Sequence, residues 1–253
     1  MELPANAFKA ALTTRRRQIG MWSALASPVA AEIIAHSGFD WVLIDTEHAP
    51  NDLPDVLAQA QALAAGPAPV LARPAWNDTV VIKRLLDIGI QSLIVPFVQN
   101  ADEAAAAVAA TRYPPGGVRG VAGGSRATRY GRVSGYHARA HDELAVVVQI
   151  ETAEAVAQID EIAAVDGIDA LFVGPADLAA SMGHLGNIGH PDVQAAIREA
   201  ATRAHAAGKP IGTLAVDVDV ANIYFDYGYD FIAVAVDAVL LARAADALVA
   251  EFR

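Results

Sequence analysis

The chain has 253 residues, of which 54% are hydrophobic and 19% are charged, and its formal net charge is -11. A chain this apolar buries enough surface to offset its ordering entropy, which excludes intrinsic disorder. The acidic balance argues against nucleic acid and anionic membranes as partners, because both bind basic surfaces. The absence of cysteine excludes disulfides, thiolate catalysis and cysteine-ligated metals. The sequence contains neither an apolar run of about 18 residues nor a signal peptide, and we expect a cytoplasmic protein.

Short apolar segments of strand type alternate with longer, alanine-rich segments of helical type along the whole chain. The predicted strands are Gly20–Ala24, Trp41–Asp45, Val70–Arg73, Ser92–Val95, Leu144–Ile150, Ala170–Val173, Ile211–Ala215 and Phe231–Val234. The predicted helices are Pro28–His36, Leu53–Leu63, Thr79–Leu86, Ala101–Ala110, Ala153–Ala163, Asp192–Ala206, Asp217–Phe225 and Ala238–Phe252. Several of these helices start after a capping residue and end in glycine, as helix termini prefer.

The alternation indicates a parallel sheet covered by helices, because the predicted strands are apolar on both faces. Eight strand–helix units in about 250 residues are typical of a TIM (β/α)8 barrel. The alternative is an open, doubly wound sheet, but no Gly-x-Gly-x-x-Gly motif follows a predicted strand. No linker or shift in composition divides the chain, and we therefore predict one domain spanning residues 1–253.

Residues 113–142 interrupt the alternation with a long segment rich in proline, glycine and arginine. Its five arginines are Arg119, Arg126, Arg129, Arg132 and Arg139. Loops of this length inside a compact domain are usually functional or mobile. The basic cluster fits equally well an anion bound near the functional site and a solvated surface loop.

Polar side chains follow several predicted strands at their carboxyl ends, where barrels of this type carry their chemistry. Glu151 and Asp177 follow the fifth and sixth strands and are hard oxygen donors suited to Mg²⁺ or Mn²⁺. Arg73 ends the third strand and supplies a permanent charge for an oxyanion. His48 follows the second strand and carries an imidazole, the side chain most often used as a general base. Each residue alone has an ordinary explanation, as a helix cap or a polar loop residue, but together they predict chemistry through an enolate.

The positions of the three lysines distinguish two routes to such an intermediate. Aldol cleavage runs either through a bound metal ion or through a lysine Schiff base. Lys9 precedes the predicted barrel, Lys83 lies within a helix, and Lys209 precedes the seventh strand at the opposite rim. Because no lysine ends a strand, we expect a metal ion and no Schiff-base lysine.

At these residues the sequence resembles the HpcH/HpaI aldolases, a family of class II, metal-dependent pyruvate aldolases. The similarity extends from about residue 20 to residue 252. The motifs that carry it include Leu43-Ile44-Asp45-Thr46-Glu47-His48-Ala49-Pro50, Arg73-Pro74, Gln149-Ile150-Glu151-Thr152, Gly174-Pro175-Ala176-Asp177-Leu178 and His190-Pro191.

The resemblance implies a barrel of the phosphoenolpyruvate/pyruvate-binding type. Its implied reaction is the reversible cleavage of 4-hydroxy-2-oxo acids to pyruvate, or hydroxypyruvate, and an aldehyde through a metal-bound enolate, with oxaloacetate decarboxylation as a side activity. It assigns the divalent metal ion (Mg²⁺, Mn²⁺ or Co²⁺, without a nucleotide) to Glu151 and Asp177. It assigns the keto acid to a larger group: Gln149, Ala176, Gly174, Pro175 and Trp22.

The resemblance further implies that Arg73 stabilises the enolate, that His48 is the base, and that Asp87 raises the basicity of that histidine. Asp87 closes the helix before the fourth strand and is expected near the opposite rim, so it would reach a histidine only across a subunit interface. Asp45 is the alternative within the same chain. The implied assembly is a homo-oligomer, hexameric or built from trimers, in which the last helix, residues 238–252, is exchanged between neighbours.

Two other functions remain open from the sequence. An acyl-CoA or citryl lyase of the same superfamily would use the same metal ligands, but it needs a nucleotide-sized site for which the chain leaves little length. A non-catalytic barrel that binds keto acids would not need His48 as a base.

Overall fold

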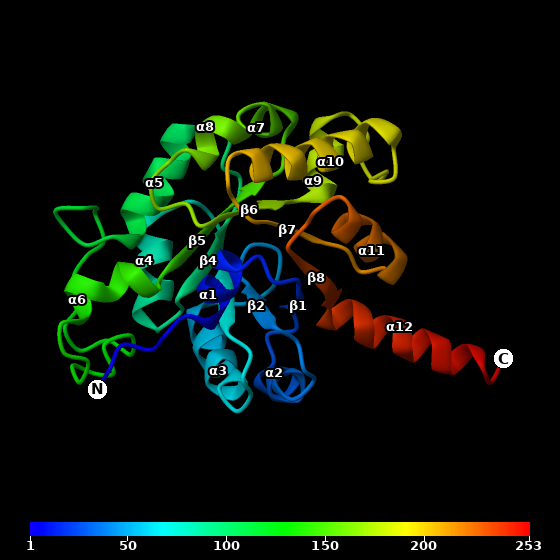
Figure 1. Ribbon diagram of the computed structural model, residues 1–253. Helices are drawn as coiled ribbons and strands as arrows, with labels where there is room; N and C mark the ends of the chain where they lie inside the picture. Colours follow the sequence, from blue (N-terminus) through cyan, green and yellow to red (C-terminus); the bar gives the residue numbers. More distant parts are fainter.

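Eight parallel strands close into a barrel in sequence order, and the last pairs with the first (Figure 1). The computed structural model describes all residues from 1 to 253. The strands are β1 (Gln18–Ser23), β2 (Trp41–Asp45), β3 (Val70–Arg73), β4 (Ser92–Val95), β5 (Ala145–Ile150), β6 (Ala170–Val173), β7 (Ile211–Leu214) and β8 (Phe231–Val236). The predicted (β/α)8 barrel is confirmed, and each strand starts and ends within two residues of its predicted bounds.

Helices surround the barrel in the predicted order. They are α2 (Pro28–Ala35), α3 (Leu53–Leu63), α4 (Thr79–Asp87), α5 (Ala101–Thr111), α10 (Pro191–Ala206), α11 (Val218–Asp226) and α12 (Asp237–Ala250). The predicted helix over 153–163 is two short helices, α7 (Ala153–Ala157) and α8 (Ile159–Ala163), because Gln158 between them leaves the helical conformation at φ -106° and ψ 14°.

Four short elements were not predicted from the sequence. They are α1 (Ala7–Thr13), α6 (Tyr136–Arg139), the 3-10 helix η1 (Ala140–Glu143) and α9 (Pro175–Ser181). Helix α6 and the 3-10 helix η1 have four residues each, and α1 and α9 have seven each, all too short for a clear apolar period. Two of them carry a local signal. Helix α9 starts with a proline in its first turn, a favoured position for that residue, and α1 follows the N-cap Asn6, a preferred capping residue.

The barrel interior is filled by side chains that alternate with those of the outer layer. Trp41 and Leu43 of β2 point inward, whereas Val42 and Ile44 belong to the outer core, as the two-residue period of a strand requires. The large inner rings depend on glycine beside them. A Cβ atom on Gly20 would lie 2.1 Å from the Trp41 ring, and one on Gly212 would lie 2.2 Å from Phe231.

Helix α1 closes the amino-terminal end of the barrel. Phe8 and Leu12 belong to the inner cluster, and the Phe8 ring lies 5.4 Å from Phe231 and 6.0 Å from Trp41, measured between ring centroids. Both partners are the first residues of their strands. The plug leaves the carboxyl-terminal end as the open end of the barrel.

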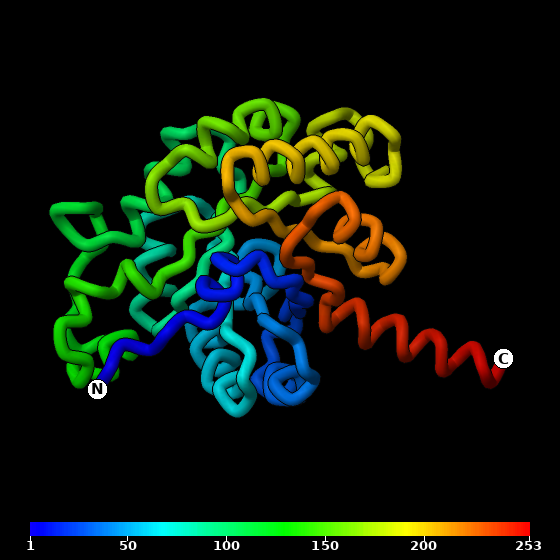
Figure 2. Tube along the Cα trace, in the orientation of Figure 1, coloured from blue at the N-terminus to red at the C-terminus, as the bar shows by residue number.

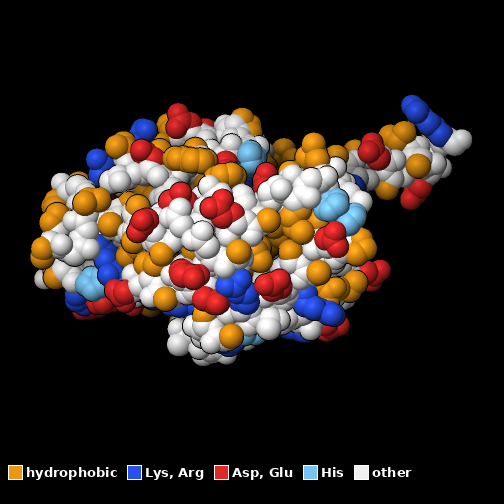
Figure 3. Space-filling model, turned by 90° about the horizontal axis from the view of Figure 1, so that it is seen from above, with side chains coloured by type: hydrophobic (Ala, Val, Ile, Leu, Met, Phe, Trp, Pro, Cys, Tyr) orange, Lys and Arg blue, Asp and Glu red, His pale blue; other side chains and the backbone are white.

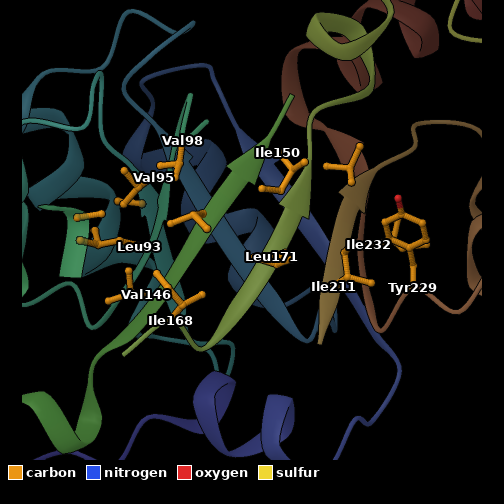
Figure 4. Packing of buried hydrophobic residues seen from close by; sticks show 14 of the residues in the cluster. Leu93, Val95, Val98, Val146, Ile150, Ile168, Leu171, Ile211, Tyr229 and Ile232 are labelled. Atoms are coloured by element: carbon orange, nitrogen blue, oxygen red, sulfur yellow. The ribbon is translucent and has the colours of Figure 1, made fainter. Parts of the chain in front are cut away.

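The outer core lies between the strands and the surrounding helices. Figure 4 shows Leu93, Val146, Leu171, Ile211 and Ile232, which come from β4 to β8 and belong to this one cluster. This layer holds the strands in register, so the residues at their ends keep fixed positions.

Helix α12 leaves the barrel as a projecting arm (Figures 1 and 3). Its first residue, Asp237, is its only buried one, and its apolar side chains are exposed: Leu240, Leu241, Leu248 and Val249, with Phe252 just beyond. At the other terminus, the first residues run beside the segment 113–142 (Figure 2), where the amino group of Met1 donates to the Arg132 carbonyl at 2.9 Å. None of the helices has the length and apolar character that crossing a bilayer demands.

Candidate active site

The turn after β2 is tied to the end of β3 at the open rim. Asp45 and Arg73 are paired in the sheet, and both the backbone nitrogen and the hydroxyl of Thr46 donate to the Arg73 carbonyl, at 3.0 and 2.6 Å. The backbone nitrogen of Glu47 donates to Asp45 Oδ1 at 3.0 Å. These bonds hold the turn that carries Glu47 and His48 against the third strand.

Arg73 is buried at this rim with its guanidinium fixed on three sides. Its Nε and Nη2 donate to the two carboxylate oxygens of Asp45 at 2.8 and 2.7 Å, and Nη1 lies 2.8 Å from Glu47 Oε2. The Trp22 ring lies under the guanidinium at 4.9 Å. Burial alone would lower the pKa of Arg73, but the hydrogen bonds and charge of Asp45 outweigh it and raise this pKa. The cation is therefore permanent and oriented.

Glu151 is buried a short distance along the rim. Gln149 Nε2 donates to Glu151 Oε2 at 2.6 Å, and the backbone nitrogen of Phe97 donates to Oε1 at 2.7 Å. Burial, together with the charges of Glu47 and Asp177, raises the pKa of Glu151 to about 7 despite these hydrogen bonds. Burial also raises the pKa of Glu47, although Arg73 and His48 oppose the shift. The carboxylates of Glu47, Glu151 and Asp177 thus share one region, in which Arg73 is the permanent cation.

This donor set fits a hard divalent cation. Asp177 lies in the first turn of α9 and is exposed, whereas Glu151 is buried. Glu47 Oε2 is buried and, although close to Arg73, has no aligned hydrogen-bond donor. Carboxylate oxygens are the preferred ligands of Mg²⁺ and Mn²⁺, and such an ion would balance the buried charge of Glu151, whose pKa is raised by burial and by the charges of Glu47 and Asp177.

Gly174 leaves the space that Glu151 occupies. A Cβ atom at this position would lie 2.5 Å from Glu151 Oε2 and 3.0 Å from its Cβ. We expect Gly174→Ala to displace the carboxylate and weaken divalent-metal affinity at least 10-fold, as loss of supporting contacts around a metal ligand typically does. Titration with Mn²⁺ measures the effect. Gly124→Ala has open space around its Cβ and an ordinary backbone conformation and serves as a control, and equal affinities in the two variants would contradict the expectation.

His48 stands at the same rim but faces solvent. Its side chain is 64% exposed, and its nearest ionic partner is Glu47, with Nε2 to Oε2 at 3.9 Å. Asp45, the alternative partner within the chain, is fully engaged by Arg73 and by the Glu47 backbone. Burial tends to raise the pKa of Asp45, but the bonds and charge of Arg73 lower it overall. Asp45 therefore orients the arginine rather than the histidine.

Asp87 does not join this group within the chain. It ends α4, just before the amino-terminal start of β4, and its Oδ1 accepts a hydrogen bond from Arg119 Nη2 at 3.0 Å. Arg119 is completely buried and stacks on Tyr113 at 4.5 Å. Because residues 113–142 connect α5 to the start of β5, their arginines lie at the end of the barrel opposite the rim. An anion bound beside the rim of the same chain is therefore not supported.

Two features of the rim escaped sequence reasoning. The motif that contains His48 also includes Glu47, for which the sequence indicates no role. In the fold Glu47 contacts Arg73 and contributes to the raised pKa of Glu151. Phe97 contributes its backbone nitrogen from the left-handed region, at φ 56°, a conformation that costs energy and tends to occur at functional sites. A backbone donor leaves no signature in the sequence.

A second group of side chains of the kinds that bind metal ions lies after α9. His184, His190 and Asp192 bring their ligand atoms within 4.8 Å of one another. The two imidazoles are stacked, with ring centroids 3.5 Å apart and an interplanar angle of 14°. Their in-plane lone pairs therefore run side by side instead of converging on one ion. The carboxylates at the rim are the better candidate.

The fold and the rim together define a (β/α)8-barrel protein with a fixed arginine beside carboxylates that suit a divalent cation. Residues 18–244 match the family model described as HpcH/HpaI aldolase/citrate lyase. The chain belongs to this family, which confirms the resemblance seen in the motifs.

Relatives match over nearly the full length. The chain is 54% identical to a 4-hydroxy-2-oxo-heptane-1,7-dioate aldolase of Klebsiella pneumoniae, over 98% of this chain and 94% of the relative. It is 54% identical to a pyruvate aldolase of Rhizobium etli, over 100% and 99% of the two chains. A crystal structure of an HpcH/HpaI aldolase/citrate lyase family protein from Burkholderia cenocepacia superposes with a TM-score of 0.96, at 42% identity and coverage of 98% and 100%.

Proposed function

We propose that this protein is a divalent-metal-dependent aldolase that reversibly cleaves 4-hydroxy-2-oxo acids to pyruvate, or hydroxypyruvate, and an aldehyde. The observation that carries the proposal is the buried Arg73, held by Asp45 at 2.7 and 2.8 Å beside the carboxylates of Glu47 and Glu151. A permanent cation next to a metal-binding region suits a reaction that develops an enolate oxyanion. The names of the two relatives support the same reaction.

The chain's own residues divide the work of the reaction. Glu151 and Asp177 would hold the cation, which supplies Lewis acidity toward the carbonyl group of the keto acid. Gln149, Trp22 and the segment Gly174-Pro175-Ala176 would line the keto-acid site. Arg73 balances the negative charge that develops on the 2-oxo oxygen as the bond between C3 and C4 breaks.

His48 moves the proton. It would accept the proton of the 4-hydroxyl group while the electrons of the broken C3–C4 bond form the enolate, which leaves an aldehyde. The enolate then takes a proton from water at C3 to give the keto acid, and His48, which faces solvent, returns its proton to water. Because a general base typically contributes about 100- to 10,000-fold, we expect His48→Ala to lower kcat by at least 100-fold while Mn²⁺ affinity stays the same. Steady-state kinetics and Mn²⁺ titration measure both. His36→Ala is the control, because His36 caps α2 away from the rim, and unchanged turnover in His48→Ala would remove the histidine from this role.

The exposed helix α12 suggests contact with a second copy of the chain. We propose that α12 packs on a second copy of the chain in a homo-oligomer, since its apolar side chains have no partner within the chain. Asp87 ends α4 at the opposite end of the barrel from His48, so the role that the resemblance implies for it would require the His48 of a neighbouring copy in this oligomer. Light scattering of the full chain and of a chain ending at residue 237 tests the arm. The same number of subunits in both forms would contradict the packing.

A cleavage assay with metal removal tests the function. The purified protein is treated with a chelator, assayed on 4-hydroxy-2-oxo-heptane-1,7-dioate, and assayed again after addition of Mg²⁺, Mn²⁺ or Co²⁺. We expect pyruvate release to stop and to return with the ion. Release that continues in the metal-free protein would overturn the proposed function.

A further inference from the structure

A network of buried, hydrogen-bonded polar side chains lies behind the rim and takes no part in the chemistry proposed above. Its members are Asp237, Ser23, Gln59 and Asn51, each of them less than 8% exposed. They come from the start of α12, the end of β1, the middle of α3 and the segment before α3. Buried polar groups are costly unless they are hydrogen-bonded. Every side chain of this network is hydrogen-bonded, and such an arrangement calls for an explanation.

One end of this network fixes the backbone that follows β1. The two carboxylate oxygens of Asp237 accept hydrogen bonds from the backbone nitrogens of Ala24 and Leu25, at 2.8 and 3.2 Å. Ser23 Oγ lies 3.3 Å from Asp237 Oδ2 and donates its shorter bond, of 2.8 Å, to Gln59 Oε1. The base of the projecting helix is thereby joined to α3.

The other end reaches the turn that carries His48. Gln59 Nε2 donates to Asn51 Oδ1 at 2.7 Å and to the Asp55 carbonyl at 3.2 Å. Asn51 Nδ2 donates to the Asp45 carbonyl at 2.6 Å and to the Ser23 carbonyl at 3.4 Å. Turning either amide over would place donor against donor or acceptor against acceptor, so the network accepts one arrangement only.

The bond from Asn51 to Asp45 closes the turn of residues 46–50 at both of its ends. The same Asp45 holds Arg73 through its carboxylate. Movement of the Asp45 backbone would therefore shift the guanidinium and His48 together.

We propose that Asn51 and Gln59 are positioning residues for the reaction. They set the place of the His48 turn and of the Asp45–Arg73 pair without touching the substrate. This inference rests on the proposed function. Gln59 lies on the buried face of α3, among Val56, Ala60 and Leu63, where an apolar side chain would pack without any need for partners. An amide at such a position is explained by the bonds it makes to Ser23 and Asn51.

The test compares Gln59→Met with the control Gln61→Met. Methionine is unbranched like glutamine and fills similar space, and Gln61 is the exposed glutamine of the same helix. We expect Gln59→Met to lower kcat about 10- to 100-fold, the usual effect of displacing reacting groups by about 1 Å, with Mn²⁺ affinity within about 2-fold of the unmodified protein. Gln61→Met should match the unmodified protein in both. Normal kcat in folded Gln59→Met would overturn the inference.

Asn51→Ala provides a second variant if Gln59→Met does not fold. If the two residues act through one chain of bonds, the double variant is expected to be no slower than the slower single variant, because coupled residues are not additive. If the fold-losses in kcat of the two single variants instead multiply in the double variant, the two residues do not act through one chain of bonds.

Hydrogen exchange gives a readout that does not need activity. The backbone nitrogens of Thr46 and Glu47 are bonded to Arg73 and Asp45, and we expect their amides to exchange at least 10-fold faster in Gln59→Met than in Gln61→Met. Unchanged exchange would refute the positioning role even if the unmodified protein cleaves no hydroxy-oxo acid. Absent cleavage in the unmodified protein would contradict the proposed function instead.

Discussion

Replacing Arg73 by lysine is expected to lower kcat for cleavage about 100- to 1,000-fold, the range found when one preorganised oxyanion donor is removed. The guanidinium meets Asp45 with two parallel bonds and still directs Nη1 toward Glu47 and Gln149. An ammonium group has no such fork and is not interchangeable with it. Lysine would pair with Asp45 and leave the enolate oxygen without its cation.

The kinetics of Arg73→Lys are compared with those of Arg112→Lys. Arg112 also pairs with an aspartate, at 2.9 Å, but that partner, Asp166, is 91% exposed, and exposed pairs contribute little. Mn²⁺ titration checks that the metal region is intact. A kcat for Arg73→Lys within about 3-fold of the unmodified protein would mean that the arginine does not stabilise the oxyanion.

Glu151→Gln is expected to abolish measurable cleavage by removing one of the two proposed metal ligands, with Mn²⁺ affinity reduced by at least about 100-fold, beyond the usual cost of losing a supporting contact. The same change should leave the thermal unfolding temperature unchanged or raise it. The Glu151 pKa of about 7 shows that its charge is disfavoured by burial and by Glu47 and Asp177. A neutral amide of the same shape carries no charge to bury, and its oxygen keeps the bond from the Phe97 backbone if the Gln149 amide turns over to accept from the new NH2 group.

Calorimetry and Mn²⁺ titration separate these two effects. Glu154→Gln is the matched control, since Glu154 is an exposed residue at the start of α7. Loss of activity together with loss of stability would point to general damage, whereas cleavage that persists in a folded Glu151→Gln would contradict the ligand assignment.

The barrel was predictable because its strands and helices carry strong local signals. Apolar runs such as Val70–Arg73, followed by polar residues at the strand ends, indicate both the parallel sheet and the rim that carries Arg73 and Glu151. The elements that escaped prediction depend on distant contacts. Helix α1 is a short helix whose Phe8 finds its partners in β2 and β8, more than 30 residues away in sequence, and no local pattern reports such packing.

The same distinction applies within the site. Arg73, Glu151 and Asp177 were assigned from strand-end positions, and the structure brings the first two beside Glu47. The pairing of Asp45 with Arg73, the donor role of the Phe97 backbone and the buried bond between Gln59 and Asn51 follow from the register of neighbouring strands and the packing of α3. Sequence reasoning names the residue types at a rim, but only the fold determines which of them meet.

Exchange of the C3 protons of pyruvate tests the central claim most directly. The protein loaded with Mn²⁺ or Mg²⁺ is incubated with pyruvate in deuterated water without any aldehyde, and deuterium in the methyl group is followed by mass spectrometry. We expect the label to enter with the unmodified protein and to fail to enter with Arg73→Lys and with Glu151→Gln, because exchange requires an enolate and not binding alone. No exchange by the metal-loaded, unmodified protein would contradict enolate chemistry at this rim.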